Sequence, residues 1–351
     1  MIDTMIGAVF KGQGRLVLEA RPVPRIRGPH DVLLAVKGVG ICGTDLHILE
    51  VPPRHPASVD VIMGHEFCGE VVEVGSEVTN CRPGDPVAVD QNAGCGHCME
   101  CRRGYPNACE TVFSAPVPGF ANTPGIFWDG ALARYIVVPD YMLYKVPATI
   151  PWRHLAITET LACAINALRK ANPRAGETAV VLGAGPVGLL LIALLKHSGT
   201  RVIVTEVSPQ RGAVARKIGA DLVVDPMATD PKDAVWSATG GKGADITIEA
   251  VGPLFDQCVA LTRFGGQVVL FGHDELARPQ VPPAAIVRKE LQIVGVFLAQ
   301  YTFVPAIALL EQGVLPMDDV VSHVMPLDRV LEAHRMMRAG QALKIVIDPS
   351  N

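Results

Sequence analysis

Short apolar runs, interrupted at close intervals by Gly and Pro, occupy the first part of the chain up to about residue 147. Runs of β-branched and aromatic residues bounded by turn residues are typical of strands in all-β domains. The pattern therefore predicts a compact, barrel-like β domain whose loops are available for function. The clearest of these runs are Val32–Val36, Glu70–Val74, Pro86–Val89 and Tyr135–Val138.

Longer apolar runs alternate with helical patterns in the second part of the chain. Apolar residues recur at helical spacing over Gln210–Ile218 and Phe255–Thr262, for example. Strands that alternate with helices predict parallel βαβ units, and six such strands complete a doubly wound α/β sheet. The strand-like runs are Ala179–Leu182, Arg201–Thr205, Leu222–Asp225, Ala244–Ala250, Gln267–Phe271 and Leu291–Phe297.

The first pattern gives way to the second near Trp152, where Ala156–Lys170 has the spacing of an apolar-faced helix. A further helical pattern runs from Tyr301 to Gln312, and we expect the last β-type run, Lys344–Ile347, to return to the first domain. The sequence thus predicts a first domain of residues 1–155 and 299–351 and a second domain of residues 156–298.

One segment of the second domain, from Thr178 to Glu206, combines a strand, a glycine turn, a helix and a strand that ends on an acid. The glycines of a GxGxxG turn allow the sharp bend, the approach of a pyrophosphate and close helix packing, and the helix N-terminus offers free N–H groups. Glu206 is the 18th residue after Gly188, near the spacing that reaches a ribose 2′-hydroxyl. A glycine turn without a ligand is the alternative. The predicted cofactor-binding residues are Gly183, Gly185, Pro186, Val187, Gly188, Glu206 and Arg211.

Composition narrows the class of protein. The 351 residues are 49% apolar and 19% charged, with a net charge of −4. These values describe a globular protein with a large core, and the absence of a broad basic field disfavours nucleic acid and anionic membranes as partners. The N-terminal stretch shows neither a basic n-region nor a long apolar h-region, so we expect a cytoplasmic protein.

Four of the nine cysteines lie close together on a Gly-rich segment of about residues 92–112. The spacing C-x2-C-x2-C-x7-C offers four thiolates, which favours a closed, structural zinc site because no coordination position stays open. An iron–sulfur cluster is one rival, and a nucleic-acid-binding zinc ribbon is a second, although only Arg102 and Arg103 are basic nearby. The predicted ligands are Cys95, Cys98, Cys101 and Cys109.

A second group of metal-type residues comes earlier in the chain. A thiol, a hydroxyl, a carboxylate and an imidazole fall within six positions, and a Gly-His-Glu motif follows. Cys, His and carboxylate are the ligand types of a catalytic zinc that keeps one position open. Glu159 joins the candidates because a carboxylate in a largely apolar stretch is costly unless it is paired or metal-bound; a solvated glutamate at a helix start is the alternative. The candidates are Cys42, Thr44, Asp45, His47, His65, Glu66 and Glu159.

Taken in order, these motifs resemble the zinc-containing medium-chain alcohol and polyol dehydrogenases, nearest in character to the sorbitol and threonine dehydrogenase branches. The resemblance implies a GroES-like β-barrel catalytic domain, a Rossmann coenzyme domain and an active site in the cleft between them. It implies Cys42 and His65 as ligands of the catalytic zinc and Asp45 as the acceptor that orients His65. Either Glu66 or Glu159 is implied as the third ligand, and the two can exchange with water.

The family resemblance also implies the reaction, an alcohol–ketone interconversion with hydride transfer to a nicotinamide. Zinc would lower the pKa of the substrate hydroxyl, Thr44 would accept the proton, and a relay through the cofactor ribose would end at His47. Glu206 favours NAD, because a carboxylate would repel a 2′-phosphate, whereas Arg211 could pair with that phosphate. The expected cofactors are NAD and two zinc ions per chain, one catalytic and one structural.

The expected substrate is a small secondary alcohol or polyol. Leu298 and Ala299 stand where sorbitol dehydrogenases typically show Arg-Tyr. With Phe127, Trp128 and Phe297 nearby, a less polar secondary alcohol or a cyclic polyol is favoured. An enzyme working mainly as a carbonyl reductase and a non-catalytic dinucleotide-binding protein are the alternatives.

The resemblance finally implies a homo-oligomer, either a dimer or a tetramer. Such oligomers are often joined through the edge strands of their Rossmann domains. We therefore expect the strand around Leu291–Phe297 to take part in a two-fold interface.

Overall fold

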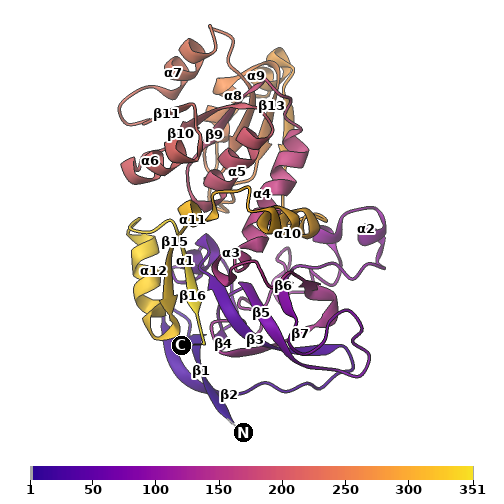
Figure 1. Cartoon of the computed structure of the whole chain (residues 1–351). Coiled ribbons are helices and arrows are strands. Elements are labelled where there is room, and N and C mark those ends of the chain that lie inside the picture. The colour runs from indigo at the N-terminus through magenta and orange to yellow at the C-terminus, as the bar shows by residue number, and fades with distance from the viewer. Residues whose placement is uncertain (1–2, 351) are drawn as a thin grey trace. The chain divides into compact units, whose positions relative to one another are not determined.

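A computed structural model describes residues 3–350 of the chain (Figure 1). The chain forms two compact units. Unit 1 consists of residues 1–162 and 299–351, and unit 2 consists of residues 163–298. The division falls inside helix α4 (Thr158–Ala171), a few residues after the boundary expected at residue 156. Within the described residues, no helix is both long and apolar enough to cross a membrane.

Unit 2 is built on a six-stranded parallel sheet in the order β11-β10-β9-β12-β13-β14. Its central strands are nearly fully buried because they carry continuous β-branched and leucine side chains, as expected for a parallel sheet covered on both faces. Chain order reverses between β9 and β12, which is the position where doubly wound folds bind their ligands. The strands are β9 (Thr178–Leu182), β10 (Arg201–Thr205), β11 (Leu222–Val224), β12 (Ala244–Glu249), β13 (Thr262–Leu270) and β14 (Gln292–Gly295).

The helices of unit 2 lie between these strands along the chain, as the alternating pattern predicts (Figure 1). Ser208 caps α6 by accepting a hydrogen bond from the Arg211 N–H, and Gly219 ends that helix in the left-handed conformation with φ 120°. The apolar core between sheet and helices includes Val180, Ile203 and Val268. The helices are α5 (Pro186–His197), α6 (Pro209–Ile218), α7 (Pro231–Ala238), α8 (Phe255–Leu261) and α9 (Pro283–Lys289).

Unit 1 contains two sheets. The smaller has the order β2-β1-β4, and the larger has the order β15-β16-β3-β5-β6-β8 with β7 paired to β3. The long central strand β3 is buried along most of its length, and one apolar cluster joins both sheets. The strands are β1 (Thr4–Phe10), β2 (Leu16–Pro22), β3 (Asp31–Gly40), β4 (Val61–Ile62), β5 (Glu66–Val74), β6 (Pro86–Val89), β7 (Tyr135–Pro139), β8 (Leu143–Lys145), β15 (Val321–Pro326) and β16 (Lys344–Asp348).

The C-terminal strand returns to unit 1, because β16 pairs antiparallel with the end of β3. In that register Val346 lies opposite Gly40, so the start of β16 reaches the segment that leads into α1. The helical segments of unit 1 are α1 (Gly43–Ile48), α2 (Met99–Arg102), η1 (Pro106–Ala108), η2 (Asp140–Met142), α3 (Trp152–Leu155), the start of α4, α10 (Phe303–Gln312), α11 (Met317–Val320), η3 (Leu327–Arg329) and α12 (Val330–Arg338).

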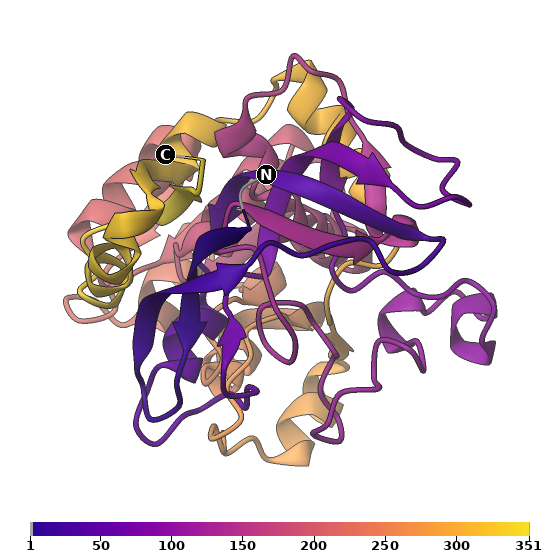
Figure 2. The ribbon, with the colours of Figure 1, turned by 90° about the horizontal axis from the view of Figure 1, so that it is seen from below.

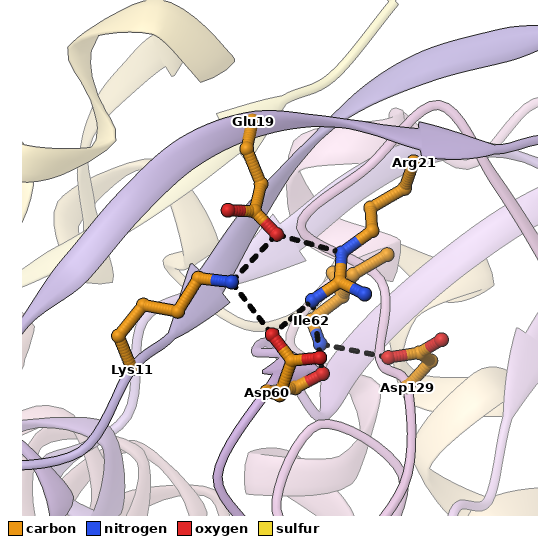
Figure 3. Close-up of polar contacts among 6 residues, drawn as sticks. All are labelled: Lys11, Glu19, Arg21, Asp60, Ile62 and Asp129. Atoms are coloured by element: carbon orange, nitrogen blue, oxygen red, sulfur yellow. Dashed lines mark hydrogen bonds and ion pairs between the residues drawn. The ribbon is translucent and has the colours of Figure 1, made fainter.

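A four-residue charge network ties the loop before β4 to the hairpin of β1 and β2 (Figure 3). Lys11 Nζ and Arg21 Nη2 each lie 2.6 Å from the Asp60 carboxylate, and both side chains also pair with Glu19. Asp60 has a left-handed backbone, with φ 70°, which is uncommon for a residue other than glycine. The network therefore holds a strained corner two residues before Ile62, whose N–H donates to Asp129.

Candidate active site and metal sites

Cys42 sits at the point where strand β3 gives way to helix α1. It is the N-cap residue of that helix, and its backbone N–H donates to the Asp45 carboxylate over 2.8 Å. A carboxylate in the first turn satisfies a free N–H and favours the positive end of the helix dipole. Cys42 Sγ lies 3.7 Å from Thr44 Oγ1, so the predicted ligand and the predicted proton acceptor are neighbours.

His65 faces the same carboxylate from the start of strand β5. His65 Nδ1 lies 3.4 Å from Asp45 Oδ1, and both side chains are buried. Burial alone would lower the pKa of His65, but the Asp45 charge outweighs it and raises that pKa well above its ordinary value. Burial likewise opposes ionisation of Asp45, yet the His65 ring and the Cys42 N–H hold the Asp45 pKa below its usual range. Because Nδ1 faces Asp45, Nε2 is left to bind a metal.

Glu66 forms a fully buried ion pair with Lys344, the first residue of β16. Burial would lower the pKa of Lys344, but the Glu66 carboxylate, together with Cys42, raises it. Gly40 gives the pair its space, since a Cβ there would collide with the Glu66 carboxylate and come within 3.1 Å of Lys344 Cε. Lys344 therefore sets where the Glu66 carboxylate lies.

These contacts bring three of the predicted ligands together. Cys42, His65 and Glu66 each offer one ligand atom, and these atoms lie within 4.8 Å of one another. Glu159 is outside that group, although it lies close enough to Lys344 to raise the pKa of that lysine. One thiol, one imidazole and one carboxylate match the donor set of an open zinc site, so the residues present fit a catalytic zinc.

Sequence reasoning missed two residues around this site, Lys344 and Asp90. Burial, with the Glu159 carboxylate nearby, raises the pKa of Asp90 to about 7. The one local signal for Lys344 is a lysine at the start of an otherwise apolar strand, Lys344–Asp348. Asp90 gives a similar signal, an acid that directly follows the apolar strand β6.

The remaining member of the predicted proton relay, His47, is half-buried in the last turn of α1. Its Nδ1 lies 3.3 Å from Glu50 Oε1, one turn further along. The ring therefore lies beside an acidic side chain.

The four predicted cysteine ligands form the second metal-type cluster, in a lobe that includes α2 and η1. Their sulfur atoms lie within 4.8 Å of one another. Backbone N–H groups point at the sulfurs: the Cys95 N–H donates to Cys109 Sγ over 3.3 Å, and the Cys98 N–H donates to Cys95 Sγ over 3.4 Å. Burial opposes ionisation of Cys109, but the backbone N–H groups of Cys95, Val112 and Thr111 lower its pKa to about 6. Four thiol ligands with such donors fit a closed zinc site.

The lobe makes two polar contacts with the segment that follows residue 299. Gln300 Nε2 donates to Gly104 O over 2.6 Å, and the Tyr301 hydroxyl donates to Cys101 O over 3.1 Å. Figures 1 and 2 both show the loop around α2 standing out from the strands of unit 1. The cysteine cluster thus organises a projecting loop and the segment that binds to it.

The glycine turn of unit 2 has the geometry that the motif predicts. Gly183 has φ 95°, and a Cβ at Gly188 would collide with Gly183 O, so the turn and the close helix packing both need glycine. Gly185 is the N-cap of α5, Pro186 is its first residue, and a Cβ at Gly185 would meet no atom within 4 Å. Backbone can therefore approach a bound pyrophosphate at the helix N-terminus.

Glu206 closes this turn from the end of β10. Its Oε2 accepts the Ala184 N–H over 2.7 Å and its Oε1 accepts the Ser208 N–H over 2.8 Å. Each carboxylate oxygen can accept a second hydrogen bond, so both oxygens can still accept from ribose hydroxyls. Arg211, in the first turn of α6, has a buried Nε without a hydrogen-bond partner among the described residues.

Two family descriptions match successive parts of the chain. Residues 28–148 match the alcohol dehydrogenase GroES-like domain, and residues 186–312 match the zinc-binding dehydrogenase domain. D-xylulose reductase A of Aspergillus oryzae is 32% identical, over 97% of this chain and 95% of that protein. The chain belongs to the zinc-containing medium-chain alcohol and polyol dehydrogenases.

Further members show the same full-length similarity. The sorbitol dehydrogenase of Halalkalibacterium halodurans is 32% identical, over 96% of this chain and 97% of that protein. Among solved structures, a zinc-binding dehydrogenase from Sinorhizobium meliloti 1021 bound to NADP is 30% identical with a TM-score of 0.89 and 99% coverage of both chains. The 2R,3R-butanediol dehydrogenase of Bacillus subtilis is 30% identical with a TM-score of 0.86, over 98% of this chain and 99% of that one.

The family membership, the α/β fold class with its GroES-like and Rossmann parts, and the enzyme class predicted from the sequence are thereby confirmed. The chain is a zinc-dependent, nicotinamide-dependent dehydrogenase of the alcohol and polyol type.

Proposed function

We propose that this dehydrogenase oxidises a small secondary alcohol or polyol to the ketone with NAD, using Cys42, His65 and Glu66 as ligands of its catalytic zinc. The observation that supports this assignment is that the three ligand atoms lie within 4.8 Å of one another. Each ligand residue is also contacted by a second residue of unit 1. Asp45 orients both Cys42 and His65, and Lys344 holds Glu66. When bound there, zinc supplies the Lewis acidity that makes a substrate hydroxyl easier to ionise, and the nicotinamide supplies the hydride acceptor.

Glu66, and not Glu159, is the carboxylate that we assign to the zinc. Its position is determined by a buried lysine and by the absence of a side chain at Gly40, so little freedom remains to be lost on metal binding. Glu159 lies near Asp90 and Lys344. We propose that its charge raises the pKa of both groups and that it does not bind the metal.

Thr44 and His47 carry the proton away in this proposal. The Thr44 hydroxyl is beside Cys42 and can accept the proton of the substrate hydroxyl. His47 is half-buried, so its ring can reach solvent and pass the proton on. When the cofactor is bound, its ribose would supply the hydroxyl groups between Thr44 and His47, as the family resemblance implies.

NAD is the coenzyme that we propose, with Glu206 as the selecting residue. Its buried carboxylate lies at the end of β10 and would repel a 2′-phosphate. The Sinorhizobium meliloti relative holds NADP, and the unpaired Nε of Arg211 is the feature of this chain that could favour that coenzyme. Comparing kcat/KM for NAD and NADP tests the proposal directly; a clear preference for NADP would contradict it.

The substrate class that we favour is a less polar secondary alcohol or a cyclic polyol. The named relatives act, by their names, on xylulose, sorbitol and butanediol, which share a secondary hydroxyl or the matching ketone. Leu298 and Ala299 supply no charged group to a sugar chain. Of the aromatic side chains expected nearby, Phe127 is buried and Phe297 is exposed in the isolated chain.

A structural zinc in the four-cysteine lobe and a homo-oligomer complete the proposal. The lobe positions Gln300 and Tyr301 and carries no substrate-binding role. Strand β14 is at the edge of the unit 2 sheet, and Ile293 is 36% exposed there, so two copies can pair through this edge. We propose a cytoplasmic location because nine thiols, four of them in a metal-type cluster, suit a reducing compartment. Mass measurement in solution tests the dimer or tetramer.

The decisive experiment measures nicotinamide reduction with linear polyols, cyclic polyols and aliphatic secondary alcohols, with NAD and NADP in parallel. It is repeated after a chelator has removed metal and again after zinc has been restored. We expect turnover that needs zinc and prefers NAD. NAD binding without turnover on every substrate would contradict the proposal and favour the non-catalytic alternative. Faster turnover of linear hexitols than of all other classes would contradict the substrate assignment alone.

A further inference from the structure

A cavity of about 440 Å³ lies in unit 1 outside the candidate active site. Its walls come from three segments that are far apart in the sequence: the turn into β2, the end of α1 and one face of α12. None of its lining residues is a predicted ligand or relay residue. Its volume falls in the range of about 300–1,000 Å³ that is typical of small-molecule sites.

The cavity is rich in positive charge. Arg15 comes from the turn into β2, and Arg335 and Arg338 lie three positions apart on α12. Among residues 3–350, no carboxylate is within ion-pair distance of these three guanidinium groups. Glu332 on α12 forms an ion pair with Arg329, and the Arg335 charge helps to lower the Glu332 pKa only from a longer distance. Arg338 Nη2 donates to Leu46 O and Leu49 O over 3.4 and 3.3 Å, contacts to neutral groups that leave its charge uncompensated.

His334 supplies a buried polar atom that has no partner. The residue is only 6% exposed and lines the cavity from α12. Its Nδ1 lies 2.8 Å from Val330 O, so Nδ1 carries the hydrogen and donates to that carbonyl. Nε2 is buried with no hydrogen-bond partner in the described part of the chain. A buried polar atom without a partner is costly, and a bound ligand would relieve that cost.

Apolar side chains form the rest of the wall. Leu16 and Leu49 are buried, and Val17 and Leu331 are partly exposed at the rim. Three guanidinium groups select an oxoanion, which arginine binds with paired hydrogen bonds. The apolar wall, in turn, suits a carbon skeleton attached to that anion.

We propose that this cavity is a binding site for a small phosphate monoester, with Arg15, Arg335 and Arg338 on the phosphate and His334 Nε2 on a ligand hydroxyl or a protonated phosphate oxygen. The cavity contains none of the proposed zinc ligands or relay residues, but it adjoins them, because His334 lies close enough to Asp45 to lower the pKa of that carboxylate. All residues that line the cavity belong to unit 1, and the proposal of a phosphate site there does not rest on the proposed alcohol substrate.

The test titrates the full, zinc-loaded chain with glycerol phosphate by isothermal calorimetry in the presence of saturating NADH. Filling the coenzyme site removes its own phosphate contacts from the measurement, and NADH fluorescence checks that filling independently. We expect one saturable site per chain. The double variant Arg15→Gln/Arg335→Gln should bind about tenfold or more weakly, because two charge-assisted contacts are lost. Arg25→Gln, an exposed arginine of unit 1 outside the cavity, should bind like the parent chain.

Three outcomes would overturn the proposal. The first is the absence of saturable binding in chains that still bind NADH. The second is equal weakening in the Arg25→Gln control, which would show a diffuse counterion effect. The third is inorganic phosphate binding as tightly as glycerol phosphate, which would exclude a role for the apolar wall. His334→Gln, compared at matched thermal stability, should weaken the monoester more than inorganic phosphate; an equal effect on both would count against its assigned contact.

Discussion

The two metal-type sites of unit 1 are built in opposite ways. The proposed catalytic site draws Cys42, His65 and Glu66 from two places in the chain and depends on Lys344 from a third. Buried charged side chains hold His65 and Glu66, and the Asp45 carboxylate accepts the backbone N–H of the partly buried Cys42. The cysteine lobe takes all its ligands from residues 95–109, and its sulfurs are served by backbone N–H groups.

The two sites therefore differ in how far their geometry depends on the surrounding fold. The catalytic site is positioned by strand pairing and buried ion pairs, so its geometry should survive loss of the metal. The lobe has only a small apolar cluster around Cys101, Cys109 and Val112, so its structure should depend on the metal itself.

The largest expected effect is on catalysis. His65→Ala should lower kcat/KM by about a thousandfold, because zinc-derived stabilisation of several kcal/mol is lost. Metal analysis should show one zinc ion lost per chain and the lobe zinc kept. If the variant lost both ions, the two sites would be coupled and the contrast between them would fail.

The second prediction concerns the buried ion pair. Lys344→Met should destabilise the chain by about 3–5 kcal/mol, because the Glu66 carboxylate is left buried and unpaired in the metal-free protein. Added zinc should restore part of this loss, since the metal supplies positive charge. Chemical denaturation with and without zinc measures both values. Lys344→Arg, which keeps the charge, is the control; if it were as destabilised as Lys344→Met, packing and not charge would be the cause.

Breaking the lobe should affect stability more than chemistry. Cys109→Ser should release the lobe zinc and lower the free energy of unfolding by about 3 kcal/mol. The value of kcat should fall little, because the lobe affects the rest of unit 1 through its contacts with Gln300 and Tyr301. Thermal unfolding and metal analysis give the two readouts. Cys81→Ser, a cysteine outside both clusters, serves as the matched control. A thousandfold fall in kcat with the catalytic zinc still bound would contradict a structural role.

The smallest effect is a pH dependence of the metal-free protein. A group whose pKa is raised on folding stabilises the folded state below its unfolded pKa and loses that contribution as pH rises through the folded value. The raised pKa of His65 beside Asp45 therefore predicts a loss of stability from about pH 6.5 upward. Denaturation of chelator-treated protein between neutral and alkaline pH measures it.

Asp45→Asn provides the reference for that measurement. The variant removes the charge that raises the His65 pKa, so its stability should change less over the same pH range. The zinc-loaded parent chain should also change less, because the metal replaces the proton on His65. Identical profiles for parent and variant without metal would contradict the assigned ion pair.

Much of the fold could be predicted from the sequence because its elements are marked locally. The strand predicted at Arg201–Thr205 matches β10, and the helix predicted over Ala156–Lys170 corresponds to α4, which begins two residues later at Thr158. Strand β13 begins at Thr262, earlier than the predicted Gln267, because two glycines weaken the strand pattern there. Its pairing with β12 extends the strand, and that pairing is a tertiary contact.

By itself, the sequence determined the sites whose parts are neighbours along the chain. The four cysteines and the glycine turn are readable because their ligands and N–H groups are brought together by local backbone geometry, as the structure shows at Cys109 and Gly188. Only the tertiary structure decided that Glu66 joins Cys42 and His65, and that Lys344 holds it. Glu66 and Lys344 are 278 positions apart in the sequence. Their pairing cannot be predicted from local spacing, because it arises only when the last strand packs against β3. The physical reason is that a buried charge finds its partner through the packing of strands, which depends on the whole fold.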